Sequence, residues 1–163
     1  MKRNRWILPC IAAVLALAAV LIYFLQPNEE PATQAAVQTA GTGNIVIEAS
    51  DLSADKISFF RIGGDSKIEL LARIGDDGEI KAVLGTCQSC NGSPGAYYTQ
   101  QGNTLRCNNC GLTFPLSVID APGGGCHPIM IDPSLITRSD GCIEIDRTGL
   151  SVYESLFEKV APH

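Results

Sequence analysis

The sequence has few aromatic residues, few charges and almost no histidine. Aromatic residues make up 6% of the 163 residues and charged residues 18%, which favours a small and mostly aliphatic core. The only histidines are His127 and the terminal His163. We find no Ser/His/Asp set, no phosphate-binding loop and no recognisable carboxylate pair, so nothing in the sequence indicates an enzyme.

Basic residues are also scarce outside the N-terminus. Lys2, Arg3 and Arg5 are the only charges in the first 25 residues, and the remainder holds nine basic and 17 acidic residues. Phosphate contacts depend on Lys/Arg clusters, so this balance argues against nucleic-acid binding.

One long uncharged run is present, at residues 6–25, after a basic tail at 1–5. Twenty residues in a helix span about 30 Å, the thickness of a bilayer core. Trp6 and Tyr23 stand near its two ends, and the basic side stays in the cytoplasm. The run predicts an uncleaved, single-pass signal anchor in the cytoplasmic (inner) membrane, with the body on the periplasmic or extracellular side. A cleaved signal peptide is the alternative.

Residues 26–43 are rich in Pro, Ala, Thr, Gln and Gly and are expected to form a flexible linker. The body, residues 44–163, is predicted to be α+β and mostly β, with a C-terminal helix. Residues 67–74 fit either a strand or a short helix. The other segments that we expect to be strands are 45–49, 57–62, 79–84, 96–100, 104–107 and 142–146.

The closing helix is expected at residues 151–160. Ser151 and Glu154 have the spacing of a capping box. Val152, Leu156 and Val160 recur at helical spacing and are expected to face the core.

Residues 85–130 form a cysteine-rich part with two C-x-x-C pairs, Cys87/Cys90 and Cys107/Cys110, separated by sixteen residues. This spacing is typical of a four-thiolate metal site, because each tight turn points two sulfurs at one ion. Gly111 follows the second pair and permits the backbone angles that such a turn needs.

A fifth cysteine, Cys126, follows three glycines. Gly124 and Gly125 are expected to bring backbone amides close to a sulfur, although the glycines also fit a simple mobile turn. His127 and Met130 are additional candidate ligands. The six cysteines outside the anchor can also be interpreted without a metal, as three disulfides. In the metal interpretation Cys142 is expected to be a buried apolar residue.

The body resembles the FtrD-like family of bacterial membrane iron–sulfur proteins over residues 43–150. The segments that carry the resemblance are Cys87-x-x-Cys90, Gly95-Ala-Tyr97, Cys107-Asn-Asn-Cys110-Gly-x-x-Phe114-Pro115 and Gly124-Gly125-Cys126-x-Pro128. The resemblance implies a ferredoxin-like component of a ferrous-iron uptake system, working beside an iron permease. It also implies that Cys87, Cys90, Cys107, Cys110 and Cys126 are the metal ligands.

These observations favour an iron–sulfur cluster or iron, bound by thiolates, in an electron carrier with a membrane redox or iron-permease partner. Thiolates also suit zinc and copper. A structural zinc module and a copper or iron trafficking protein that uses His127 and Met130 therefore remain alternatives.

Overall fold

The computed structural model describes residues 38–39 and 43–161. This part of the chain is strand-rich, with three small sheets and one short α-helix near its C-terminal end. The basic tail and the membrane anchor predicted from the sequence lie outside the described residues, as does most of the predicted linker. Among the residues described, no helix has the length and apolar character needed to cross a bilayer.

The central sheet has the strand order β3-β4-β5-β9 and is antiparallel. It consists of β3 (Ser58–Arg61), β4 (Glu69–Ile74), β5 (Ile80–Cys87) and β9 (Pro128–Met130). Alternate side chains enter two separate apolar cores, so both faces of the sheet are covered. Phe60, Leu70 and Leu84 belong to the first core, and Phe59, Leu71 and Val83 to the second.

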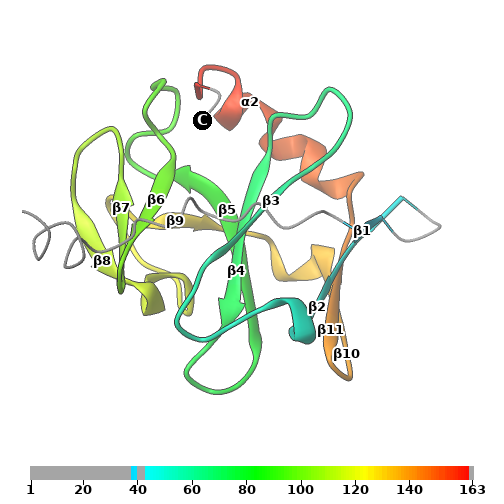
Figure 1. Ribbon diagram of the computed structural model, residues 1–163. Coiled ribbons are helices and arrows are strands. Elements are labelled where there is room, and N and C mark those ends of the chain that lie inside the picture. The colour runs from blue at the N-terminus through cyan, green and yellow to red at the C-terminus, as the bar shows by residue number, and fades with distance from the viewer. Residues whose placement is uncertain (1–37, 40–42, 162–163) are drawn as a thin grey trace, which may run out of the picture. The chain divides into compact units, whose positions relative to one another are not determined.

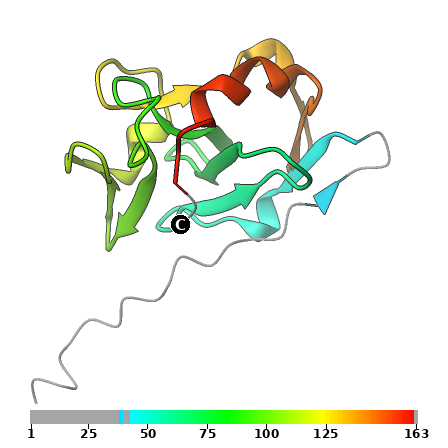
Figure 2. The same cartoon turned by 90° about the horizontal axis from the view of Figure 1, so that it is seen from above.

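The first core is closed by a second sheet of order β1-β2-β11-β10, on the right in Figure 1. Its strands are β1 (Gln38–Thr39), β2 (Ile45–Glu48), β10 (Ile136–Ser139) and β11 (Cys142–Ile145). The 3₁₀ turns η1 (Ala49–Asp51) and η3 (Pro133–Leu135) lie at the strand ends. The C-terminal turns η4 (Gly149–Tyr153) and α2 (Glu154–Phe157) run along one side of the sheets (Figure 2), with Phe157 buried in the first core.

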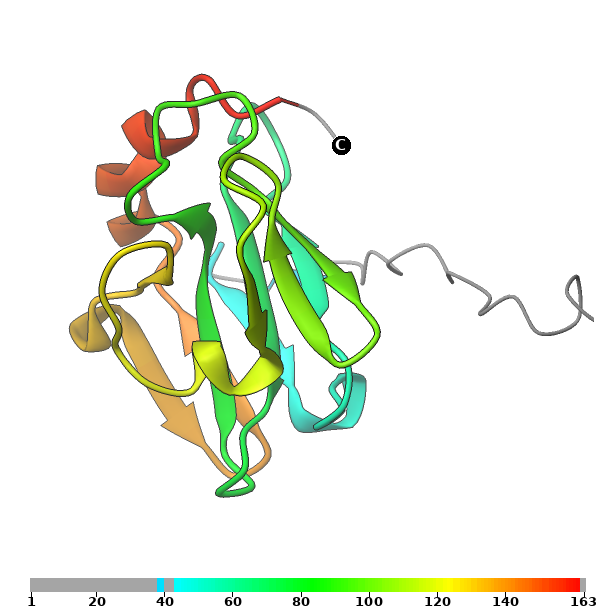
Figure 3. The same ribbon diagram turned by 90° about the vertical axis from the view of Figure 1, so that its left-hand side faces the viewer.

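The second core is closed by a three-stranded sheet on the opposite side (Figure 3). It contains β6 (Tyr98–Gln101), β7 (Thr104–Cys107) and β8 (Thr113–Pro115), followed by η2 (Leu116–Ile119). Tyr98, Leu105 and Ile119 are completely buried beneath it. Because this sheet packs on the end of β5, it brings the second cysteine pair to the first.

All the strands predicted from the sequence are present, with ends shifted by at most three residues. Residues 67–74 contain strand β4, which pairs with β3 as a hairpin. Gly102-Asn103 closes the β6–β7 hairpin, with Gln101 opposite Thr104. The short strands β1, β8, β9 and β10 were not predicted, because two to four residues show too little periodicity to be recognised, and β1 lies in residues that were expected to form the linker.

The C-terminal helix differs from its prediction. The segment starts as the 3₁₀ turn η4, and α2 covers only residues 154–157. Ser151 makes no cap, and Val152 is 72% exposed. A 3₁₀ turn repeats every three residues rather than every 3.6, so it rotates Val152 out of the expected apolar face. Cys142 was also expected to be buried, yet it is only half-buried, because Ile143 and Ile145 take the inner positions of β11.

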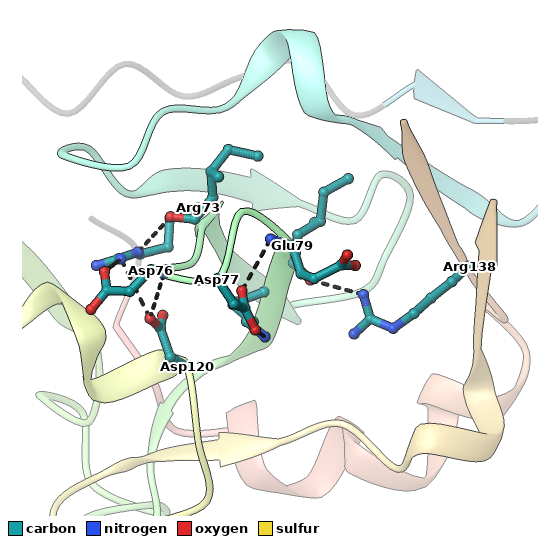
Figure 4. Close-up of polar contacts among 9 residues, drawn as sticks. Arg73, Asp76, Asp77, Glu79, Asp120 and Arg138 are labelled. Atoms are coloured by element: carbon teal, nitrogen blue, oxygen red, sulfur yellow. Dashed lines mark hydrogen bonds and ion pairs between the residues drawn. The ribbon is translucent and has the colours of Figure 1, made fainter. Parts of the chain in front are cut away.

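A buried arginine ties the turn between β4 and β5 to the segment that follows η2 (Figure 4). Arg73 pairs with Asp76, and its Nη2 atom lies 3.4 Å from Asp120 Oδ2. The Asp76 backbone N–H also donates to Asp120, at 3.3 Å. These contacts hold the start of residues 120–127, which we call the glycine loop and which carries Cys126.

Candidate metal centre

Each C-x-x-C pair begins on the last residue of a strand, Cys87 on β5 and Cys107 on β7. In the first turn the Asn91 N–H donates to the Cys87 carbonyl at 2.8 Å, and in the second the Gly111 N–H donates to the Cys107 carbonyl at 2.9 Å. Gly111 has a φ of +75°, a conformation that other residues rarely adopt. The two turns thus share one kind of hydrogen bond, while their backbones differ at the residue that donates it, since Asn91 has no positive φ.

Three consecutive carbonyl groups of the glycine loop accept hydrogen bonds, two from the first turn and one from Tyr98 on β6. The carbonyls of Gly125 and His127 accept from the amides of Ser89 and Gln88, at 3.1 and 2.9 Å. Between them, the Cys126 carbonyl accepts from the Tyr98 hydroxyl at 2.6 Å. Cys126 is therefore held in place from both sides, although the sequence around it contains three glycines.

The structure brings all five predicted ligand cysteines together; we call this set the thiol cluster. Its sulfurs form two groups of three, and within each group all sulfurs lie within 4.8 Å of one another. Cys87, Cys90 and Cys107 are the inner triad, and Cys90, Cys110 and Cys126 are the outer triad. The two triads share Cys90. Cys110 and Cys126 are 3.4 Å apart, sulfur to sulfur.

The inner and outer triads differ in their access to solvent. Cys87 and Cys107 are fully buried in the second core and Cys90 is 8% exposed. Cys126 is half-buried and Cys110 is exposed. The thiol cluster therefore has a side closed by apolar packing and an edge that solvent reaches.

Hydrogen bonding and burial divide the thiols into two kinds. A hydrogen bond from the Leu112 N–H, together with hydrogen bonds between Cys110 and neighbouring thiols, lowers the pKa of Cys110 to about 7. The hydrogen bond between Cys110 and Cys126 raises the pKa of the Cys126 thiol. Burial raises the pKa of Cys107 to about 12.

Tyr98 is a polar neighbour of the cluster that lies in the predicted strand 96–100 and was not predicted as a site residue. Its side chain is completely buried, and its pKa is raised by burial and by the nearby Cys87 sulfur. Burial acts to raise the pKa of Cys87, but its contact with the Tyr98 hydroxyl and its hydrogen bonds with Cys90 and Ser89 outweigh burial, and the pKa of Cys87 is lowered. No signal in the sequence distinguishes Tyr98 from Tyr97, because the strand register decides which of them points inward.

The additional candidate ligands lie beside the thiol cluster in different ways. The ring of His127 packs edge-on against Phe114, at 5.4 Å between centroids, and its buried Nδ1 atom has no hydrogen-bond partner. His127 belongs to neither triad. Met130, on β9, packs against the second core, which also contains the inner triad.

The donor set fits a thiophilic metal. All six cysteines among the described residues are free thiols, and five of them converge. Both triads consist of sulfur alone, the ligand type selected by iron–sulfur clusters, zinc and Cu(I). The closed side formed by Cys87 and Cys107 supplies the dry surroundings that protect such a centre. The residues present therefore fit the iron–sulfur cofactor expected from the resemblance, and fit zinc or copper equally.

Comparison with known families agrees with this geometry. The family model described as "Membrane iron-sulfur containing protein FtrD-like" matches residues 52–157. The chain belongs to the FtrD-like family. The matched region of this FtrD-like chain covers the central sheet and the whole thiol cluster. No curated protein and no solved structure matches the chain significantly.

Proposed function

We propose that this FtrD-like chain is a membrane-anchored electron carrier in which the thiol cluster holds iron, as an iron–sulfur cluster or as bound ions. The body is proposed to lie on the periplasmic or extracellular side and to exchange electrons with an iron permease or another membrane redox partner. The observation that carries the proposal is the convergence of five thiols in a family described as iron–sulfur-containing.

An iron centre bound here would supply a one-electron couple. The residues of the chain determine the hydrogen bonds to the ligand sulfurs and the exposure of the centre to solvent. The amides of Ser89 and Cys90, in the first turn, donate hydrogen bonds to Cys87 and so favour its thiolate form. The exposed Cys110 supports electron exchange at the outer edge of the cluster, since it is the sulfur that a docked partner reaches first.

The test is purification of the full chain in detergent without oxygen. We expect a coloured protein that contains iron, with a visible absorption that bleaches on oxidation or reduction. Cys107→Ser is expected to remove both colour and iron, while the matched control Cys142→Ser, on β11 of another sheet, keeps them. A folded, colourless protein without iron would refute the proposal.

A structural zinc module is the second candidate, because sulfurs within 4.8 Å of one another also suit zinc with its Zn–S distance of about 2.3 Å. It predicts zinc in the native protein, no redox activity and unfolding by chelators. Native iron bound by sulfur would exclude it.

Metal trafficking is the third candidate, supported by His127, which follows Cys126 in the chain, and by Met130, which packs against the core that contains the inner triad. If His127→Ala and Met130→Ala leave the affinity for Cu(I) and ferrous iron unchanged, this candidate loses its support.

A further inference from the structure

The two triads suggest more than one metal position. We propose that the thiol cluster holds two metal ions side by side, an inner ion on Cys87, Cys90 and Cys107 and an outer ion on Cys90, Cys110 and Cys126, with the Cys90 sulfur bridging them. The inference deepens the proposed function and depends on it only in requiring that the cluster binds metal.

The sulfur spacing in each triad suits one ion. A metal–sulfur distance of about 2.3 Å in a tetrahedron puts neighbouring sulfurs about 3.8 Å apart. Within each triad all sulfurs are within 4.8 Å, and Cys110 and Cys126 are 3.4 Å apart. Each triad therefore provides three corners of a tetrahedron, and water or inorganic sulfide completes the fourth.

The grouping of the sulfurs does not follow the two C-x-x-C pairs. A single four-thiolate ion requires Cys110 to join Cys87, Cys90 and Cys107, and leaves Cys126 unused. In the structure the outer triad joins Cys110 to Cys126 and to Cys90. Further sulfur contacts, between Cys107 and Cys110 and between Cys87 and Cys126, hold the two triads against each other. Cys90 is the one residue that belongs to both triads, which makes it the bridging thiolate.

The backbone around Cys126 is fixed by hydrogen bonds. Hydrogen bonds from Gln88, Ser89 and Tyr98 fix the carbonyls of residues 125–127. The Arg73–Asp120 contact fixes the start of the glycine loop. A loop anchored at both ends supports a dedicated ligand position for Cys126.

The two positions differ in exposure, and this difference predicts their exchange behaviour. Cys87 and Cys107, on the inner position, are fully buried, whereas Cys110, on the outer position, is exposed. A chelator in solution therefore reaches the outer ion first. We expect metal release in two separate phases, and the variant Cys126→Ser should retain only the slow phase.

The decisive experiment titrates Cd²⁺ into the reduced, metal-free full chain in detergent and records cadmium NMR spectra. We expect two ions per chain and two resonances, each split by coupling through the shared Cys90 sulfur. Cys126→Ser should reduce the stoichiometry from two to one. The matched control Cys142→Ser should keep both ions and the splitting.

One ion in the wild-type chain, or two resonances without mutual splitting, would overturn the inference. The spectrum of the wild-type chain decides this even if a variant fails to fold. A chain that shows two coupled cadmium ions but never takes up iron would refute the electron-carrier proposal alone. A chain that assembles an iron centre but binds a single cadmium ion would refute the two-position inference alone.

Discussion

Cys110 should be the most reactive thiol of the reduced, metal-free cluster. At pH 7 a pKa of about 7 leaves about half of Cys110 as thiolate. For Cys107, a pKa of about 12 leaves the thiolate form in only about one molecule in 10⁵. A more basic thiolate is the better nucleophile. With a Brønsted slope of about 0.45, the value for thiol–disulfide exchange, this raises the relative rate of Cys107 by a factor of about 200. We therefore expect Cys110 to react about 300-fold faster, before the burial of Cys107 adds to the difference.

The assay is timed alkylation with iodoacetamide, followed by tandem mass spectrometry to locate the label. Because the pKa of Cys110 is lowered, its thiolate persists as the pH falls and is lost only below about pH 7. Its rate should rise through an inflection near pH 7 and then level off. Labelling of Cys107 before Cys110, or an inflection near the ordinary cysteine pKa of about 8.5, would refute the reasoning. Metal binding should protect Cys110.

Three substitutions, one of them with a matched control, test the glycine loop and the first core. Gly123→Ala should weaken metal binding at least tenfold by equilibrium titration, because its Cβ atom would overlap His127 Nδ1 and displace the glycine loop, whereas Gly124→Ala, with open space around it, should not. Tyr98→Phe removes the donor to the glycine loop and should lower the free energy of unfolding by about 1 kcal/mol in a urea titration. Leu84→Ala creates a cavity in the first core, where Leu84 is completely buried, and should cost about 2–5 kcal/mol in the same titration.

Each of these has a contrary outcome. Equal metal affinities of the two alanine variants would contradict the role of the glycine loop. An unchanged urea midpoint for Tyr98→Phe would mean that water replaces the lost donor at no cost. A loss below about 1 kcal/mol for Leu84→Ala would show that the first core collapses around the cavity.

The strands with clear apolar alternation were predictable from local sequence. Residues 45–48 and 142–145 alternate, and they form the neighbouring strands β2 and β11. Residues 67–74 were ambiguous, because a strand buried on both faces loses the alternation that distinguishes it from a helix. The C-terminal segment was predicted with the wrong period, since a 3₁₀ turn and a short α-helix replace one continuous helix.

The sequence by itself determined which five thiols are candidate ligands, because the C-x-x-C spacing and the glycines before Cys126 are local properties. Only the tertiary structure decided how the sulfurs are grouped. The packing of β7 against the end of β5 buries Cys87 and Cys107 in the second core, and the carbonyls of the glycine loop hold Cys126 beside Cys110. These contacts join residues far apart in sequence, and residue spacing carries no information about which sulfur then faces solvent.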